Sequence, residues 1–388
     1  GNLDCLIQVL TCVEEIDLQF VKAFLMTFES FTSIEMFFVK LMQRYQVPSS
    51  TKSLYSSTEE WQKELVLPVR FRVVNILKML IEKHVERVCE NRWIMERLVL
   101  LIGILLPAHN LKKLAEDLAK LLKKKTNAHI KGKVQVQELE ELTPVPDNFM
   151  WSLFDDHCIA EQLTLLDHLG YCAIRPSELL GRGWVKKDKL RRSPNVVHML
   201  SRFNYLTNWV TREILNFNTP TGRSRAITRF ISIASHLLQL NNFQSTTAIL
   251  SSLNGYPILR LKQSWSQVPE TSLEVFRHLE EVMNPTYSYK NYRQALYAVE
   301  PPCVPFLAIT FMDLDFLEGS SRRESYKNMI GFSRHHRIYE VISMALMYQN
   351  PSYNIQIHPL LHSYLHHLPQ DTDHEQLVTL SQQLEPRQ

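Results

Sequence analysis

The sequence predicts an all-α fold, and three observations support this prediction. The chain has 388 residues of which 45% are apolar, so it is long enough for two domains that each bury a core. Glycine occupies only 10 positions, whereas tightly turned β folds and phosphate-binding loops use this residue heavily. Apolar residues also recur at helical spacing, as they do at Phe20, Phe24 and Phe28.

The first part of the chain is expected to form a helical bundle between about Ile7 and Leu122. A helix break with a new N-cap is predicted at Ser30–Ser33, and a serine-rich stretch at 49–58 interrupts the apolar pattern again. The longest apolar run, Leu98–Leu106, is about half of the ~20 residues that a membrane-spanning helix needs. We therefore expect this run to be a buried helix.

Residues 126–148 are predicted to be a linker between a domain at 1–125 and a second domain at 149–388. The composition there turns from basic to acidic and then contains proline, which is typical of an exposed connection. The lysine cluster of Lys123–Lys125, Lys131 and Lys133 could also meet anionic lipid or an acidic partner, but a solvated linker is the favoured interpretation. A net charge of +3 with mixed signs argues against a nucleic-acid partner.

The second part of the chain has a clear helical signal at Ala226–Leu238, where apolar residues mark one face. The pattern stops at Asn241-Asn242 and resumes in a short helix, for which Ser245 is the expected N-cap. Asn254-Gly255 should end that helix, because asparagine and glycine are common helix terminators. A helical hairpin is expected here.

Common catalytic chemistry has no minimal motif in this sequence. Phosphate-binding, dinucleotide-binding, serine-hydrolase and zinc-protease signatures are all absent, so neither a cofactor nor covalent catalysis is expected. His358, His362 and His366 have ligand-like spacing but no nearby cysteine or acidic partner, so we expect no metal. Asp155-Asp156-His157 is interpreted as a helix start. The six scattered cysteines predict reduced core thiols of an intracellular protein.

Several motifs, taken in order, carry a resemblance to a known family. They are Arg202–Val210, Leu240–Ser245, Leu253–Gly255, Leu259–Leu261 and Pro301–Leu307. At these distances they resemble the catalytic domain of Ras-family guanine-nucleotide exchange factors, such as Son of sevenless, over roughly 149–388. Upstream, Phe24–Thr32 is similar to the Ras exchanger motif, a helical domain that usually precedes this catalytic domain.

The resemblance implies an α-helical bowl with a protruding helical hairpin that opens the nucleotide site of a Ras-, Rap- or Ral-type GTPase. Prolines at 301, 302 and 305 would stiffen the hairpin base, since proline fixes φ and lacks an amide donor. The acids would act by repelling phosphate and competing for magnesium. The implied lever residues are Phe306, Asp313, Asp315 and Glu318. The implied GTPase-binding residues are Leu200, Arg202, Leu253, Asn254, Leu259 and Tyr289.

One departure from the family pattern leaves a second hypothesis open. Relatives often carry two acids before the glycine that ends the first hairpin helix, whereas this chain has only Leu317-Glu318-Gly319. The alternative is therefore a non-catalytic GTPase-binding scaffold with an impaired hairpin. The first domain either supports the hairpin or binds a second GTPase. The expected location is the cytoplasm, with recruitment to the inner face of a membrane left open.

Overall fold

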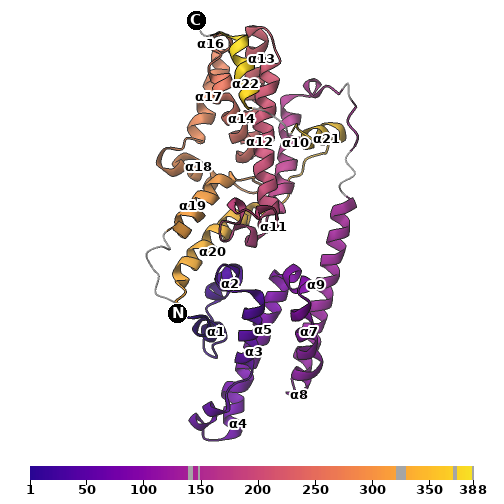
Figure 1. Cartoon of the computed structure of the whole chain (residues 1–388), viewed down its shortest axis with the longest axis vertical. Coiled ribbons are helices and arrows are strands. Elements are labelled where there is room, and N and C mark those ends of the chain that lie inside the picture. The colour runs from indigo at the N-terminus through magenta and orange to yellow at the C-terminus, as the bar shows by residue number, and fades with distance from the viewer. Residues whose placement is uncertain (139–142, 147–148, 320–328, 370–373, 387–388) are drawn as a thin grey trace. The chain divides into compact units, whose positions relative to one another are not determined.

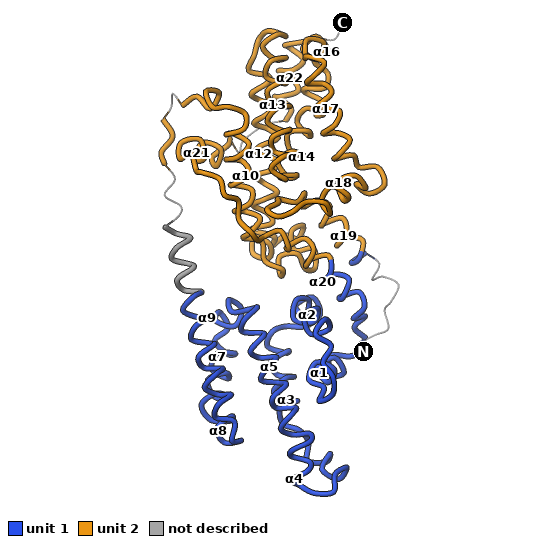
Figure 2. Tube along the Cα trace, turned by 180° about the vertical axis from the view of Figure 1, so that it is seen from behind, with its two compact units in different colours: residues 1–141, 317–340 blue, residues 142–316, 341–388 orange. Residues whose placement is uncertain are grey.

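A computed structural model describes residues 1–138, 143–146, 149–319, 329–369 and 374–386. Helices joined by short turns make up this part of the chain, which contains one isolated parallel bridge, Asn242 to Val304, and no β-strand. The all-α prediction is thus confirmed. Two compact units are present, one of residues 1–141 and 317–340 and the other of residues 142–316 and 341–388 (Figure 2). No described helix is both long and apolar enough to cross a membrane.

Unit 1 is a bundle formed mainly by helices from the first third of the chain (Figure 1), together with residues 317–340. Its helices are α1 (Leu3–Leu10), α2 (Leu18–Thr27), α3 (Ile34–Tyr45), α4 (Thr58–Trp61), α5 (Leu67–Lys83), α6 (Val85–Glu90), α7 (Arg92–Leu100), α8 (Leu106–Ala108) and α9 (Lys112–Glu138). Short π-helical turns at Gln62–Val66 and Leu101–Leu105 lead into α5 and α8. Ser33 caps α3 by accepting a hydrogen bond from the Met36 amide, as predicted.

Phenylalanines form the centre of unit 1. The rings of Phe24 and Phe28 each lie 5.1 Å from that of Phe37, and all three side chains are fully buried. The ring of Phe332, at the start of α20 (Phe332–Leu346), lies 4.5 Å from that of Phe20 in a tilted arrangement, so this distant segment joins the same core. Burial of several aromatic rings supplies much of the stabilisation of such a bundle.

Unit 2 contains the remaining helices. They are α10 (Asp156–Cys172), α11 (Lys189–Arg192), α12 (Pro194–Leu215), α13 (Pro220–Gln239), α14 (Phe243–Leu253), α15 (Tyr256–Leu259), α16 (Lys262–Trp265), α17 (Glu270–Val282), α18 (Thr286–Ala298), α19 (Leu307–Gly319), α21 (Pro359–His366) and α22 (His374–Leu384). From Leu317 the end of α19 groups with unit 1, and α20 passes from unit 1 to unit 2 after Glu340. Asp155 caps α10, as predicted.

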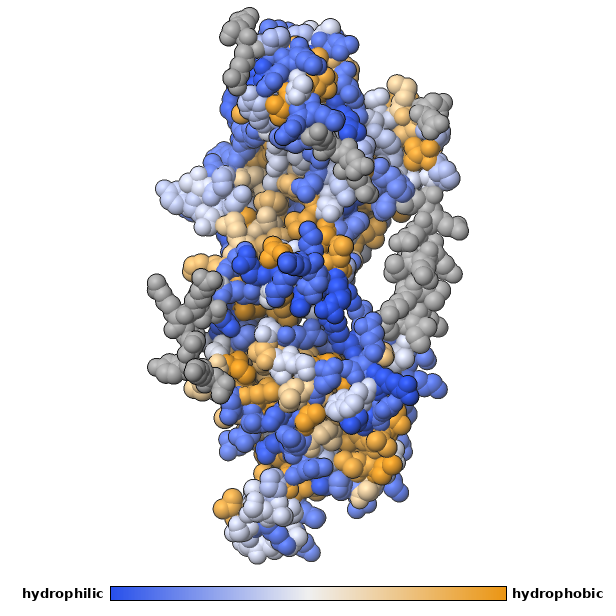
Figure 3. Space-filling model, in the orientation of Figure 1, coloured by the Kyte–Doolittle hydropathy of each residue, from blue (hydrophilic) through white to orange (hydrophobic). Residues whose placement is uncertain are grey.

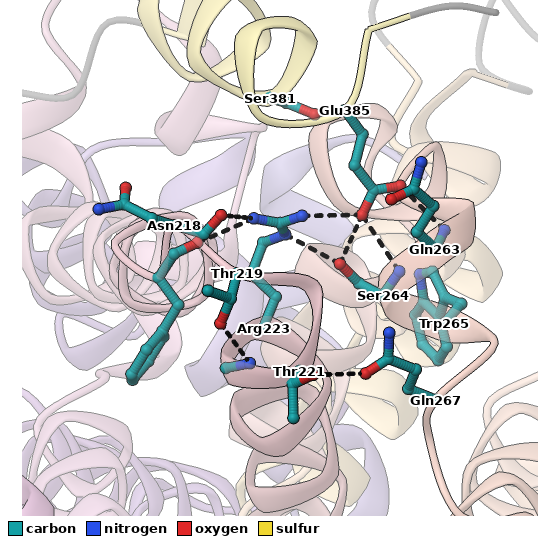
Figure 4. A network of polar contacts seen from close by, with 12 residues as sticks. Asn218, Thr219, Thr221, Arg223, Gln263, Ser264, Trp265, Gln267, Ser381 and Glu385 are labelled. Atoms are coloured by element: carbon teal, nitrogen blue, oxygen red, sulfur yellow. Dashed lines mark hydrogen bonds and ion pairs between the residues drawn. The ribbon is translucent and has the colours of Figure 1, made fainter.

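Within unit 2, a buried ion pair joins Glu385, directly after α22, to Arg223 on α13 (Figure 4). The fully buried Arg223 donates from Nη2 to Glu385 Oε1 at 3.0 Å and from Nε to Ser264 Oγ at 2.8 Å. Glu385 also accepts from the amides of Gln263 and Ser264 at 2.9 and 3.1 Å. Every charged atom of the pair therefore has a partner, which is the condition for tolerating charge in a core.

The structure corrects three local predictions. Asn242, rather than Ser245, is the N-cap of α14, and its side chain accepts from the Ser245 amide at 3.0 Å. The run Leu98–Leu106 is not buried throughout, because Val99, Leu100 and Ile104 are more than half exposed; apolar surface lies over α7 and α8 in Figure 3. The cysteines are free, but only Cys158 and Cys303 are buried.

The helix α9 continues to Glu138 and so extends into the segment 126–148. The domain limits proposed from composition stay predictions. The helix predicted at Ala226–Leu238 lies within α13, which begins earlier, at Pro220, with Thr219 as its N-cap. Proline is well suited to the first position of a helix, because its missing amide would have no partner there.

Candidate functional site

The segment before α19 is held by backbone hydrogen bonds to the turn between α13 and α14. The Val304 amide donates to the Asn241 carbonyl, and the Phe243 amide donates to the Val304 carbonyl, both at 3.0 Å. Asn241 adopts a left-handed conformation with φ of 57°, which asparagine tolerates better than most residues. Cys303 and Val304 are fully buried. Residues 303–306, which the resemblance implies to be the base of a hairpin and which we name the hairpin base, are therefore held in the core of unit 2.

Two buried side chains cap the start of α19. The Phe306 amide donates to the Tyr292 hydroxyl at 2.9 Å, and the Leu307 amide donates to the Gln244 carbonyl oxygen at 3.2 Å. The first amides of a helix have no partner within the helix, so these contacts meet a need that the helix cannot meet itself. Burial raises the pKa of the Tyr292 hydroxyl, which keeps it a neutral acceptor.

Asp167 on α10 is the centre of a buried polar network beneath this base. Its Oδ2 accepts from Asn242 Nδ2 at 3.0 Å and from the Ser245 hydroxyl, and its Oδ1 lies 3.4 Å from two nitrogens of Arg202. Arg202, which the resemblance implied for GTPase binding, thus lies in the core with its charge compensated. The motif containing Asn242 owes its position to this carboxylate.

Phe306, the first implied lever residue, is part of an aromatic cluster and is almost fully buried. Its ring centroid lies 6.0 Å from Phe203, 6.2 Å from Tyr289 and 6.5 Å from Tyr292. Aromatic pairs at such distances contribute about 0.5–1.5 kcal/mol beyond the area that they bury. Phe306 therefore joins the start of α19 to the segment that carries Tyr289.

A groove of about 560 Å³ lies between α14, α17 and α18. Of the implied GTPase-binding residues, Asn254 and Tyr289 line it. Leu253 is fully buried, Leu259 is exposed on α15, and Leu200 is partly exposed on α12. The binding role of the six implied residues stays a prediction.

Acidic residues at the groove were not identified from the sequence. Glu280 accepts from Asn254 Nδ2 at 2.8 Å, and Glu281 and Arg277 also line the groove. The signal in the sequence was only a charged face of α17, which is typical of any exposed helix. Their place beside Asn254 depends on the packing of α14 against α17.

Tyr289 lies in an unusual backbone conformation. Tyr287, Ser288 and Tyr289 have φ values of 53°, 56° and 60°, so α18 begins with a left-handed turn. Each such residue costs roughly 1–2 kcal/mol relative to the right-handed form. Strain of this kind is concentrated at functional sites, where the surrounding structure holds it in place. The turn therefore marks this wall of the groove as a candidate binding element.

The two aspartates of α19 are both paired with arginines. Asp313 accepts two hydrogen bonds from Arg293 at 2.7 and 2.8 Å. Asp315 Oδ1 lies 2.8 Å from Arg182 Nε, an ion pair without hydrogen-bond geometry. A paired carboxylate presents little net charge to a distant phosphate. The predicted action of these acids on phosphate stays a prediction, as does that of Glu318, which is partly exposed near the end of α19.

Two large apolar residues of α19 are exposed. Phe316 is 78% exposed and Met312, one turn earlier, is 44% exposed. Apolar side chains reach the surface along this helix, at the left of the middle of the molecule in Figure 3. Sequence reasoning had selected the acids of this helix and passed over these two residues.

The three regularly spaced histidines do not assemble a metal site. His358 is the N-cap of α21, while His362 is buried and His366 exposed on the same helix. Within the described ranges, no three histidine, cysteine, aspartate or glutamate side chains lie close enough together to hold a metal ion.

Burial raises the pKa of the Cys303 thiol to about 12, which makes it a poor nucleophile.

Comparison with known families decides what this arrangement belongs to. Residues 158–336 match the RasGEF domain, and residues 1–101 match the RasGEF N-terminal motif. The chain belongs to the RasGEF family. The hairpin base, the groove and α19 all lie within the RasGEF domain, and α1 to α7 correspond to the N-terminal motif.

Several curated relatives cover both parts. Ras guanine nucleotide exchange factors J and A of Dictyostelium discoideum are 32% and 31% identical over 92% of this chain, and the matches span 44% and 59% of those proteins. Ras-specific guanine nucleotide-releasing factor 1 of Rattus norvegicus is 32% identical over 64% of this chain and 20% of its own length. The chain thus spans about half the length, or less, of most relatives that it matches.

Proposed function

We propose that this protein is a guanine-nucleotide exchange factor for a Ras-, Rap- or Ral-type GTPase. The observation that carries the proposal is a RasGEF domain whose hairpin helix α19 is capped by Tyr292 and Gln244 and anchored at Val304. These contacts hold the start of α19 in place, as a helix that displaces part of a bound GTPase requires. The reaction involves no covalent step, and the proposed setting is the cytoplasm, with recruitment to the inner face of a membrane.

In the proposed mechanism, the groove beside Asn254 and Tyr289 holds one surface of the GTPase while α19 enters the magnesium and phosphate site. Exchange then requires that the factor bind nucleotide-free GTPase more tightly than loaded GTPase, because only a difference in affinity shifts an equilibrium. Weakening the nucleotide ten-thousandfold takes roughly 5.5 kcal/mol of such a difference. In this mechanism, the groove contacts the GTPase in both the loaded and the nucleotide-free state and so provides binding to both. The contacts of α19 provide the difference in affinity between the two states.

The test is release of fluorescent GDP from a panel of Ras, Rap and Ral GTPases at micromolar exchange factor. Acceleration of release from at least one GTPase supports the proposal. No acceleration from any of them contradicts it. Titrating the GTPase also yields kcat and KM, which separate the contribution of α19 from that of the groove.

A non-catalytic scaffold is the second candidate, and the short Leu317-Glu318-Gly319 end of α19 favours it. Such a scaffold would bind nucleotide-free GTPase through the groove and leave the rate of GDP release unchanged. Binding measured by pull-down, set beside the release assay, distinguishes the two candidates. A second GTPase at the N-terminal motif would appear as an added effect of the GTP-loaded form on the same release rate.

A further inference from the structure

Arg293 on α18 uses all three nitrogens of its guanidinium. Nη1 and Nη2 donate to the two oxygens of Asp313 at 2.8 and 2.7 Å, and Nε donates to the Ser288 carbonyl at 2.9 Å. Paired, charge-assisted hydrogen bonds of this kind are stronger and more directional than those of a lysine. A single side chain therefore joins α19 to the left-handed turn that carries Tyr289.

The helical positions of the two acids show how α19 is held. Residues two apart on a helix differ by about 200° in direction, so Asp313 and Asp315 lie on opposite flanks of the helix. Leu314 between them is fully buried and marks the inner face. Arg293 binds Asp313 on one flank, and Arg182 Nε lies 2.8 Å from Asp315 Oδ1 on the other. The rotation of α19 about its own axis is thereby set from both sides.

The second flank has additional support. Trp184, two residues after Arg182, stacks on Phe311 of α19 with ring centroids 4.7 Å apart. Arg182 itself has a left-handed backbone, with φ of 54°, directly after Gly181 at 61°. A non-glycine residue held in this conformation is maintained by its surroundings.

With α19 fixed in this rotation, its outer face carries Met312 and Phe316. Residues four apart on a helix lie on the same face, and both of these side chains are exposed. The bracing contacts and the outer face are thus on different sides of one helix. A loss of bracing would let the helix rotate or tilt without removing any group from the outer face.

We propose that Arg293 is a positioning residue for nucleotide exchange, which fixes α19 with Met312 and Phe316 outward and ties it to the groove wall at Tyr289. This inference rests on the proposed exchange function. It gives Asp313 the role of orienting α19 through Arg293, in place of the direct action on phosphate that the family resemblance implies. The positioning role and the direct action on phosphate make different predictions for a variant in which Arg293 and Asp313 exchange their charges.

The test compares the exchange kinetics of Arg293→Lys, Asp313→Arg and the double variant Arg293→Asp/Asp313→Arg. We expect Arg293→Lys to lower kcat about tenfold with KM within about twofold, since groove binding is retained while the lever is misplaced. The double variant should recover at least about tenfold over Asp313→Arg, because the pair re-forms in reverse. A double variant no better than Asp313→Arg would overturn the proposal and favour direct action of Asp313 on phosphate.

The matched control is Asp156→Asn. Asp156 pairs with Arg229 at 2.8 Å and has exposure similar to that of Asp313, but it lies on α10 and contacts α13. This variant should leave kcat unchanged. An equal loss of kcat in Asp156→Asn would mean that any broken ion pair in unit 2 lowers activity, which contradicts a specific role for Arg293.

A second readout does not depend on exchange activity. Amide hydrogen exchange measured by mass spectrometry should show faster exchange in α19 peptides of Arg293→Lys, with peptides of α10 unaffected. If the wild-type chain releases no GDP, the proposed function fails while this measurement still tests the bracing. Unchanged protection of α19 in Arg293→Lys would overturn the positioning role whatever the GDP assay shows.

Discussion

The backbones of Asn242 and Val304 run side by side as a parallel bridge, although 61 residues separate them in the sequence. The bridge joins the N-cap of α14 to the segment before α19, so two of the motifs that carry the family resemblance, Leu240–Ser245 and Pro301–Leu307, lie side by side. Asn242 is held in turn by Asp167, and Val304 leads directly into Phe306. Stability of these joined motifs should therefore affect both folding and exchange.

Replacing Asp167 with alanine is predicted to destabilise the chain strongly. The change leaves Arg202 as a buried charge without a partner, and breaking a buried pair in this way costs about 3–5 kcal/mol. Urea unfolding followed by circular dichroism measures the loss. Asp188→Ala is the control, because Asp188 pairs with Arg192 on the surface, and no measurable loss is expected there. Comparable losses in the two variants would show that the network is not a buried, coupled unit.

Replacing Phe306 with leucine is predicted to slow exchange about tenfold, which corresponds to about 1.4 kcal/mol of transition-state stabilisation. Leucine keeps α19 in place through the amide contact to Tyr292 but loses the ring contacts to Tyr289 and Phe203. Release of fluorescent GDP gives the rate, and the melting temperature reports the fold. Full activity in this variant would exclude a role for the aromatic cluster in placing the lever.

Replacing Ser288 with glycine is predicted to raise the stability of unit 2 by about 1 kcal/mol, because glycine adopts the left-handed conformation without strain. The carbonyl that accepts from Arg293 is kept. If the strain helps to place Tyr289, exchange should fall while the melting temperature rises. The same substitution at Ser251, which lines the groove on α14 in regular helix, should lower stability instead. Lower stability in Ser288→Gly would contradict the assigned backbone conformation.

The ion pair of Arg223 and Glu385 predicts a pH dependence of stability. Burial acts to raise the pKa of Glu385, but hydrogen bonds from Ser264 and Arg223 outweigh it and leave the pKa below its ordinary value of 4.5. A carboxyl with a lowered pKa in the folded state stabilises the fold above its unfolded pKa, and this contribution is lost as pH falls through the folded value.

Melting temperatures of the wild type and Glu385→Gln should therefore differ by a constant amount above about pH 5.5 and converge below pH 4.5. Differential scanning calorimetry from pH 7 down to pH 3 measures both. A difference between wild type and Glu385→Gln that grows on acidification would contradict the assigned sign.

Much of the fold could be predicted from the sequence because its determinants are local. Helical periodicity is present within each segment, and caps such as Ser33 and Asp155 lie a few residues from the amides that they bind. The prolines before α19 likewise act on their own backbone. The family resemblance implied GTPase-binding roles for Asn254 and Tyr289, and the structure places both in the lining of one groove. Their binding role stays a prediction.

The partners of the charged residues could not be predicted, because they depend on which helices meet. Nothing local connects Arg293 with Asp313 or Arg182 with Asp315, so their carboxylates appeared free in the sequence. The cap of α14 is a different case, since an asparagine three residues before Ser245 was a signal that went unused. The exposure of Phe316 could be inferred only after the structure showed that Leu314 is the buried side of α19.

Release of fluorescent GDP from Ras, Rap and Ral, catalysed by the wild-type chain and by Phe316→Ala, tests the central claim most directly. The wild type should accelerate release from at least one GTPase at micromolar concentration. Phe316→Ala should lower kcat with little change in KM or melting temperature, because its ring is 78% exposed and, in the proposed mechanism, acts on the GTPase through α19. No acceleration by the wild-type chain on any GTPase, with binding to the nucleotide-free form retained, would contradict the claim and identify a scaffold.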